Sequence, residues 1–254
     1  MNPLIVFWRA GRDLFDELFL MIGLNLLWLL IAGPLFILAT LLLLNGAAIP
    51  AAILALVNVL LFGPASMGLL VAAERIVDGR VASVKEFFEG MRTYRNLSWQ
   101  VYGIWVAGLI TTLFNLSFYV QIGGGLGAFL TVLFLYIAFA WSSLLIYLGP
   151  LILLQESKSL KLLWRNAAIM SFGRPIFTTI TTLMMIIILG ISVWFGILAL
   201  LLAFAFMALW GMRATVTVIA DDAERRGVRE QQQTDDSDLP IAERGRKGQI
   251  QPKK

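Results

Sequence analysis

The 254-residue chain contains no cysteine and no histidine. Without cysteine it can form no disulfide, no thiolate nucleophile and no thiolate metal site. Without histidine it lacks the commonest protein metal ligand and the usual general base near neutral pH. We therefore expect no metal, no cofactor and no enzymatic activity. A membrane enzyme remains the less favoured alternative, and its acids would have to come from Glu74, Asp78 and Glu156.

Charge is also scarce, at 14% of the residues against 59% hydrophobic ones. Every charged side chain lies outside three long blocks, Leu18–Ala73, Asn96–Gln155 and Pro175–Met212. A charge at the centre of a bilayer costs roughly 2.5–3.5 kcal/mol, so blocks of this length without one indicate chain buried in a membrane. The sequence therefore predicts an all-α protein, a polytopic transmembrane helical bundle in the cell membrane.

The first two blocks are each about twice the ~20 residues that one helix needs to cross the hydrocarbon, so each predicts a helical hairpin. The third block is long for one span and short for two. Two spans place all 20 Lys and Arg on one side of the membrane, whereas a single span would move the basic tail to the other side. We expect six spans and cytoplasmic termini, with five spans as the alternative. The spans are about 18–44, 51–73, 97–119, 128–150, 176–191 and 195–212.

Two segments on the charged side predict amphipathic surface helices, over 84–95 and 160–172. The first begins at a capping-box pattern, Ser83-Val84-Lys85-Glu86. The apolar residues of these helices are candidate docking faces for a partner protein. They are Phe87, Phe88, Met91, Leu163 and Trp164.

Two Gly-Pro pairs precede these segments, Gly63-Pro64 and Gly149-Pro150. This order suggests a degenerate duplication of a unit made of span, surface helix and span. The alternative is chance, since Gly and Pro are common in membrane helices. The composition divides the chain into a transmembrane domain, 1–220, and a polar cytoplasmic tail, 221–254, which we expect to be disordered.

The polar side chains inside the blocks are all uncharged. Asn25, Asn58 and Asn115 are the candidates for a polar seam through the membrane, because amides are rare at mid-span. The alternative is that such groups bond a neighbouring helix or their own backbone. Bonding to a neighbouring helix or to their own backbone is also expected for the hydroxyl groups in these blocks. These belong to Ser142, Ser143, Thr178, Thr179, Thr181 and Thr182. The aromatic residues of these blocks, Trp105 and Trp141 among them, indicate an interfacial belt or packing between helices.

Three short motifs follow one another over about residues 14–110. They are Leu24-Asn25-Leu26-Leu27-Trp28, Gly63-Pro64-Ala65 and Phe87-Phe88-Glu89-Gly90-Met91-Arg92. In this order they resemble the YesL-like family of bacterial membrane proteins. In that family the proline that follows the Asn-Leu-Leu-Trp motif lies within a few residues of Gly-Pro-Ala, whereas here Pro34 and Gly63 are 29 residues apart. The resemblance implies an integral inner-membrane protein that many bacteria encode beside carbohydrate uptake systems, and it assigns no reaction.

The leading hypothesis is therefore a non-catalytic membrane protein accessory to a solute uptake system, for carbohydrate. The alternative is a transporter or channel that passes a neutral solute itself. The expected partners are the lipid bilayer and other membrane transport subunits. No nucleic acid is expected, because the basic residues flank the predicted spans and are explained by retention on the cytoplasmic face.

Overall fold

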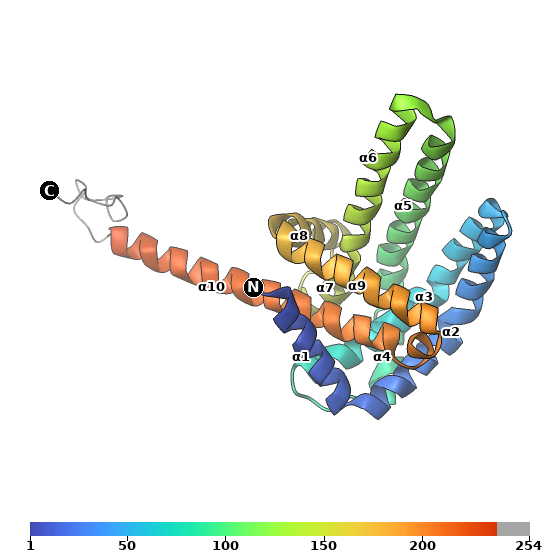
Figure 1. Cartoon of the computed structure of the whole chain (residues 1–254). Coiled ribbons are helices and arrows are strands. Elements are labelled where there is room, and N and C mark those ends of the chain that lie inside the picture. The colour runs from blue at the N-terminus through green and yellow to red at the C-terminus, as the bar shows by residue number, and fades with distance from the viewer. Residues whose placement is uncertain (238–254) are drawn as a thin grey trace. The chain divides into compact units, whose positions relative to one another are not determined.

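The computed structural model describes residues 1–237, and every regular element in this part is a helix (Figure 1). Contacts divide the chain into one unit formed by Asn2–Thr215 and another formed by Met1 with the chain from Val216 onward. The helices are α1 (Pro3–Asp16), α2 (Leu18–Leu44), α3 (Ala48–Val77), α4 (Val84–Thr93), α5 (Arg95–Ile122), α6 (Gly124–Ser143), α7 (Leu145–Leu154), α8 (Leu160–Gly173), α9 (Pro175–Phe195), the π-helix η1 (Ala199–Ala203) and α10 (Phe204–Ser237).

Six helical segments are long and apolar enough to cross a membrane, which confirms the expected all-α polytopic bundle. The first agrees with the sequence prediction at both ends, and most of the others extend several residues beyond it. The fourth consists of two helices, α6 and α7, which meet at Leu144. The segments are Leu18–Leu44, Ala48–Val77, Arg95–Ile122, Gly124–Leu154, Pro175–Phe195 and Leu201–Gly227.

Both expected surface helices are present as α4 and α8, and a third, α1, was not predicted from the sequence. Its start nevertheless carries ordinary signals: the side chain of Asn2 accepts a hydrogen bond from the Leu4 amide at 2.9 Å, and Pro3 occupies the first helical position. Val6, Ala10 and Leu14 form its buried face. Because α1 lies outside the charge-free blocks, the distribution of charge does not indicate this helix.

The expected disordered tail differs from the structure over its first part, because α10 extends to Ser237. Eight of the 17 residues from Asp221 to Ser237 are Glu, Arg or Gln, which favour helix. An ion pair between Arg225 and Asp221 at 2.8 Å, one turn apart, adds support. The remainder of the predicted tail, 238–254, lies outside the described residues.

One order of elements occurs three times along the chain: a short helix, one linking residue, a span, a short turn and a returning span. The linking residues are Glu17, Tyr94 and Arg174. The sequence suggested a duplication beginning in the second span. The structure instead shows three units, since α1, α4 and α8 each begin one.

Burial follows the same register in all three units. Seven residues before each link the side chain is fully buried, at Ala10, Phe87 and Ala167. The fourth, seventh and eighth residues after each link are also buried, which is the spacing of one helix face. These residues are Met21, Leu24, Asn25, Ser98, Val101, Tyr102, Thr178, Thr181 and Thr182. Each outgoing span therefore turns the same face inward.

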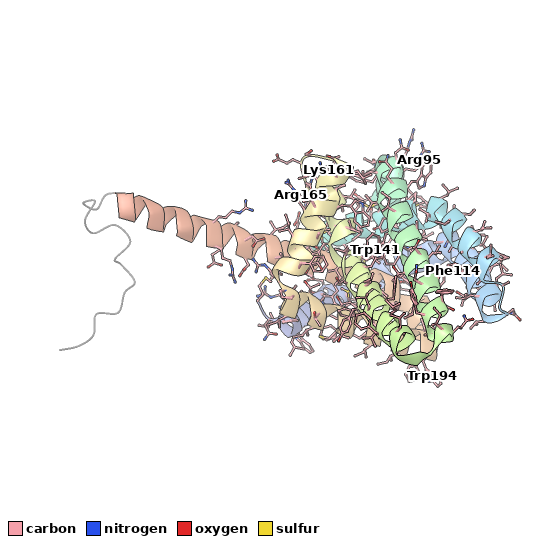
Figure 2. All side chains as sticks on the ribbon, turned by 90° about the horizontal axis from the view of Figure 1, so that it is seen from above. Arg95, Phe114, Trp141, Lys161, Arg165 and Trp194 are labelled. Atoms are coloured by element: carbon pink, nitrogen blue, oxygen red, sulfur yellow. The ribbon has the colours of Figure 1, made fainter. Side chains whose placement is uncertain are left out.

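Charged residues and the hairpin turns lie at opposite ends of the spans. In Figure 2, Arg95, Lys161 and Arg165 lie at one end of the bundle and Trp194 at the other. The turns around Gly46, Gly123 and Gly196 contain no charged residue. The charged residues of the described spans and the hairpin turns are thus at opposite ends, as the charge distribution in the sequence indicated.

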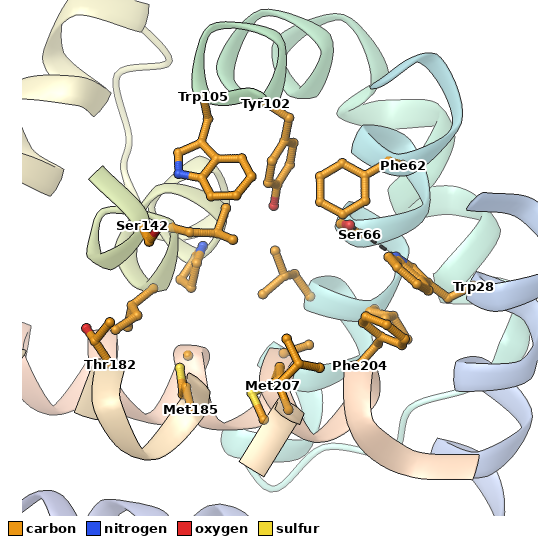
Figure 3. Close-up of a pocket in the computed structure, with 18 of the residues that line it drawn as sticks. Trp28, Phe62, Ser66, Tyr102, Trp105, Ser142, Thr182, Met185, Phe204 and Met207 are labelled. Atoms are coloured by element: carbon orange, nitrogen blue, oxygen red, sulfur yellow. Dashed lines mark hydrogen bonds between the residues drawn. The ribbon is translucent and has the colours of Figure 1, made fainter. Parts of the chain in front are cut away.

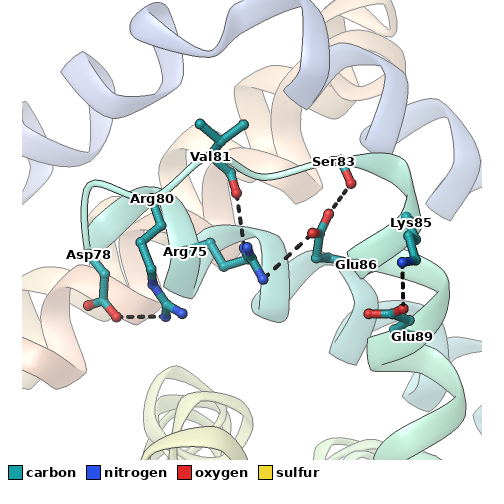
Figure 4. Close-up of polar contacts among 8 residues, drawn as sticks. All are labelled: Arg75, Asp78, Arg80, Val81, Ser83, Lys85, Glu86 and Glu89. Carbon is teal, nitrogen blue, oxygen red and sulfur yellow. Dashed lines mark hydrogen bonds and ion pairs between the residues drawn. The ribbon is translucent and has the colours of Figure 1, made fainter.

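The loop between α3 and α4 is organised by charged side chains at the charged end (Figure 4). Arg75 donates to the carbonyl of Val81 at 2.9 Å and lies 3.6 Å from the Glu86 carboxylate. The hydroxyl of Ser83 donates to Glu86, and this bond, aided by the charge of Arg75, lowers the pKa of Glu86. The expected capping pair therefore does meet, although the two side chains bond each other directly.

Candidate functional site

A cavity of about 350 Å³ lies among the spans, and every one of the six contributes to its wall (Figure 3). Trp28 comes from α2, Phe62 from α3, Tyr102 from α5, Ser142 from α6, Thr182 from α9 and Phe204 from α10. Its volume is within the range of small-molecule sites, which is about 300–1,000 Å³. The register of the repeat explains why the walls converge: Trp28, Trp105 and Met185 are each eleven residues after a link.

Aromatic rings form a continuous side of this cavity. Trp28 stacks on Phe204 with ring centroids 4.1 Å apart. Phe62 meets Trp28 edge to face at 5.8 Å and Tyr102 edge to face at 5.2 Å. Such pairs stabilise by about 0.5–1.5 kcal/mol beyond the area they bury. The rings of this side therefore support one another in the absence of a ligand.

The Trp105 corner of the cavity is fixed by two reciprocal hydrogen bonds between α5 and α6. The indole of Trp105 donates to the carbonyl of Trp141 at 3.1 Å, and the indole of Trp141 donates to the carbonyl of Trp105 at 2.8 Å. Gly108 makes room for the Trp141 ring, since a Cβ there would lie 2.3 Å from it. Trp164 of α8 stacks on Trp141 with ring centroids 5.1 Å apart. These tryptophans pack between helices, which was one of the two expected roles.

Three hydroxyl groups face the cavity with hydrogen-bonding capacity to spare. Ser66 accepts a bond from the Trp28 indole at 3.1 Å, and its own proton has no acceptor among the described residues. The hydroxyls of Tyr102 and Ser142 make no hydrogen bond to any residue that the structure describes. Thr182 differs, because its hydroxyl bonds the carbonyl of Thr178 at 2.7 Å. The free donors therefore come from α3, α5 and α6.

Two proline residues shape the walls by releasing a carbonyl four residues earlier. Pro64 releases the Leu60 carbonyl, which accepts from the Trp99 indole at 3.1 Å. Pro150 releases the Ile146 carbonyl, which accepts from the Thr215 hydroxyl at 3.3 Å. In each case a donor on another span satisfies the released group, so α3 is tied to α5 and α7 to α10.

The three amides of the predicted polar seam form no hydrogen bond with one another among the described residues. Asn25 is fully buried, and its side-chain oxygen accepts from the amides of Phe204 and Ala205, both at 2.9 Å. Asn58 is 4% exposed, and its oxygen has no partner among the described residues. Asn115 bonds the carbonyl of Thr111 in its own helix at 2.8 Å. Gly103 of α5 faces Val59, so Asn58 and Asn115 differ by about 18 Å in depth along the helix axis.

The predicted docking faces are mostly turned into the bundle. Phe87 and Leu163 are fully buried, and Phe87 packs against Gly68 of α3. Trp164 is partly buried against Trp141. Phe88 is 50% exposed and Met91 is partly exposed. Phe88 is therefore the most open of the five, and Met91 and Trp164 are intermediate.

Sequence reasoning named two of the hydroxyl groups in the cavity wall, Ser142 and Thr182, but not the aromatic wall or the free hydroxyl of Tyr102. The cavity residues that sequence reasoning did not name are related by their positions, counted from the linking residue of each unit. Tyr102 and Thr182 share the eighth place after a link, and Trp28 and Trp105 the eleventh. That register becomes visible only when α1 is recognised as the start of a unit.

The cavity wall contains no charged residue among those described, and the acids of the enzyme alternative lie elsewhere. Asp78, for example, pairs with Arg80 at 2.8 Å in the α3–α4 loop (Figure 4). Within residues 1–237 no group of three or more acidic side chains is placed to hold a metal ion. The site offers aromatic faces, aliphatic surface and a few hydroxyl donors, which suit binding.

Comparison of the chain with protein-family models, with curated proteins and with solved structures found no match. The resemblance to the YesL-like family therefore stays a prediction.

Proposed function

We propose that this protein is a multi-pass membrane protein that binds a hydrophobic, lipid-like molecule in the cavity among its six spans. One observation carries the proposal: a preformed aromatic cavity whose few polar groups include three hydroxyls with unused donors. A ligand that fills it would bury its apolar body against the rings and direct an acceptor oxygen at Ser66, Tyr102 or Ser142.

The chemistry of the wall favours an uncharged ligand with one or two acceptors, such as an ester or ketone. A charged group there would lose its hydration without gaining a countercharge. A sugar would leave many hydroxyls unpaired, since few polar side chains line the wall. The proposal is thus for lipid rather than carbohydrate binding.

The roles expected from the sequence receive different support. Passage of a neutral solute along the three asparagines receives little support, because Asn25 and Asn115 already bond backbone groups. An accessory role in carbohydrate uptake rests on the family resemblance, with Phe88 and Met91 as the accessible part of the docking faces. Both roles stay predictions, as does the absence of enzymatic activity.

We also propose that the charged end of the bundle is cytoplasmic and that the membrane is the cell membrane. The support is the confinement of Lys and Arg to the segments outside the hairpin turns.

The cavity proposal is tested by identifying what copurifies with the protein. After purification in detergent, bound small molecules would be extracted and identified by mass spectrometry. Ala208 lines the cavity, and Ala128 lies exposed near the start of α6. Ala208→Phe should lower the retained amount about tenfold by filling the cavity, while Ala128→Phe adds the same ring outside it and should change nothing. Equal retention in both variants, or only sugars in the wild type, would refute lipid binding.

The hydroxyl donors give a second, finer test. Tyr102→Phe and Ser142→Ala each remove a donor without adding volume, so each should weaken retention by about 0.5–1.5 kcal/mol if it bonds the ligand. Thr182→Val is the matched control, because its hydroxyl already bonds Thr178. A loss confined to Thr182→Val would contradict the assigned donors.

A further inference from the structure

The three surface helices expose apolar side chains as well as burying them. On α1, Leu4, Trp8 and Phe15 are 60%, 76% and 74% exposed. They lie on a different side of the helix from Val6, Ala10 and Leu14, which pack on the bundle. Residues 4, 8 and 15 recur at helical spacing, so they form one stripe. The stripe is too apolar for contact with water alone.

The other two surface helices repeat this arrangement. Val84 and Phe88, one turn apart on α4, are 44% and 50% exposed, and Ile169 and Phe172 on α8 are 59% and 61% exposed. Phe172 and Phe15 each precede a link by two residues, so they occupy the same place in their units. Each surface helix therefore has an inward face and a separate outward apolar stripe.

Exposed cations accompany each stripe. Arg9 on α1, Arg92 on α4, and Lys161 and Arg165 on α8 are all exposed. None of the four forms an ion pair with another residue of the described chain. Cations with no internal partner next to exposed aromatic rings are the pattern of a helix lying in a lipid interface.

The links fix where these helices lie. A single residue separates α1, α4 and α8 from spans that begin at Leu18, Arg95 and Pro175. One residue extends at most ~3.6 Å, so the C-terminal end of each surface helix must lie at the membrane boundary. The apolar stripes are thus continuous with the lipid-facing surface of the spans.

We propose that α1, α4 and α8 together form a binding surface for the headgroup layer of an anionic phospholipid leaflet. Arg9, Arg92, Lys161 and Arg165 contact lipid phosphates, while Trp8, Phe15, Phe88 and Phe172 insert at the boundary between headgroups and acyl chains. The partner is lipid rather than free phosphate, because the cations and the apolar stripes act on the same surface. This inference does not depend on the contents of the cavity.

Lipid selectivity provides the test. The full chain would be reconstituted in phosphatidylcholine bilayers with spin-labelled phosphatidylglycerol or spin-labelled phosphatidylcholine, and the relative association of the two labels measured. The wild type should prefer phosphatidylglycerol, and salt should reduce the preference. The variant R9Q/R92Q/K161Q/R165Q should lose about fivefold or more of this preference, since each surface cation contributes about 1 kcal/mol.

The matched control removes four cations from the C-terminal part of the chain, R225Q/R226Q/R244Q/R246Q, and should keep the preference. An equal loss in the control, or no preference in the wild type, would overturn the proposal. Equal competition by soluble glycerol phosphate would also overturn it, because the site would then be a simple anion site.

A second measurement covers the case in which the charge variant fails to fold. The natural chain lacks cysteine, so single spin labels at Trp8→Cys, Phe15→Cys and Phe172→Cys report depth directly. Oxygen should reach these labels better than a water-soluble nickel complex, with the order reversed at Asp16→Cys, which is exposed and lies about 100° around α1 from Phe15. Labels that the nickel complex reaches equally at all four positions would refute the inserted stripe.

Discussion

At the residue scale, Asn25 compensates for an irregularity in the backbone of another span. The π-helix η1 ends at Ala203, and the next two amides, of Phe204 and Ala205, both donate to the Asn25 side chain. These two amides lie at the junction of η1 with α10, where the change from π to α geometry disturbs the regular backbone bonding. A buried amide oxygen from α2 thus accepts from both amides at this junction and holds Phe204 against the cavity.

Replacement of this amide should destabilise the protein. Asn25→Leu leaves two donors unpaired in a buried site, so we expect a loss of about 1–3 kcal/mol in thermal unfolding measured in detergent. Asn115→Leu is the matched control, because Asn115 bonds only its own helix, and it should change stability by less than about 0.5 kcal/mol. Equal effects of the two substitutions would contradict this role of Asn25.

A second residue-scale prediction concerns the close contact of Gly108 with Trp141. Gly108→Ala places a Cβ 2.3 Å from an indole that is itself held by a hydrogen bond, so overpacking should cost about 1–3 kcal/mol. At Gly103 the nearest atom, of Val59, is 3.9 Å away. Gly103→Ala therefore gains helix propensity without a clash and should be neutral or stabilising in the same unfolding measurement. A stable Gly108→Ala variant would show that the Trp141 ring is free to move.

The sequence identified Asn25 as unusual because amides are rare in a charge-free block. It could not identify the partner, since a π-helix has no distinct composition and Phe204 lies far along the chain. For Asn115 the same reasoning led to a residue with a local bond only. Rarity indicates that a polar group needs a partner, but the packing of other spans decides which partner it finds.

At the scale of elements, the two Gly-Pro pairs act as connectors between spans. Each proline releases a carbonyl, and each released carbonyl is bonded by a donor from another span, Trp99 in one case and Thr215 in the other. The glycine before each proline admits close contact, with Ser98 beside Gly63 and Leu70 beside Gly149. The kinks predicted from these prolines are thus also attachment points.

A double-mutant cycle tests this coupling. Trp99→Phe removes the donor to the Leu60 carbonyl and should cost about 0.5–1.5 kcal/mol in the wild type. Pro64→Ala restores an amide that can bond the same carbonyl within α3, so Trp99→Phe should cost clearly less in that background. Identical costs in the two backgrounds would show that the Trp99 bond does not compensate for Pro64.

The long spans were predictable from the sequence because a charge-free block of sufficient length has few other structures available in lipid. α4 and α8 followed from helical periodicity. α1 was missed because its apolar residues alternate with Arg9, Arg12 and Asp13, and its start depends on Asn2 and Pro3 alone. The break at Leu144 was missed as well, because nothing in its composition separates α6 from α7.

At the scale of the whole chain, the distribution of charge predicts the topology. In intact cells, a membrane-impermeant maleimide should label Asn45→Cys in the first hairpin turn. It should label Asp78→Cys and Arg225→Cys only after permeabilisation, because both belong to charged segments. Different accessibility of Asp78→Cys and Arg225→Cys would show an odd number of crossings between them, contrary to six spans.

The single linking residue in each unit leaves almost no slack between a helix at the membrane surface and the span that follows it. Trp28, Trp105 and Met185 lie only about three turns further along, so a tilt imposed on a span is transmitted to the cavity wall. Thinner bilayers force long spans to tilt more. The width of the cavity should accordingly vary with the acyl-chain length of the host membrane, which makes membrane thickness itself an input to ligand binding.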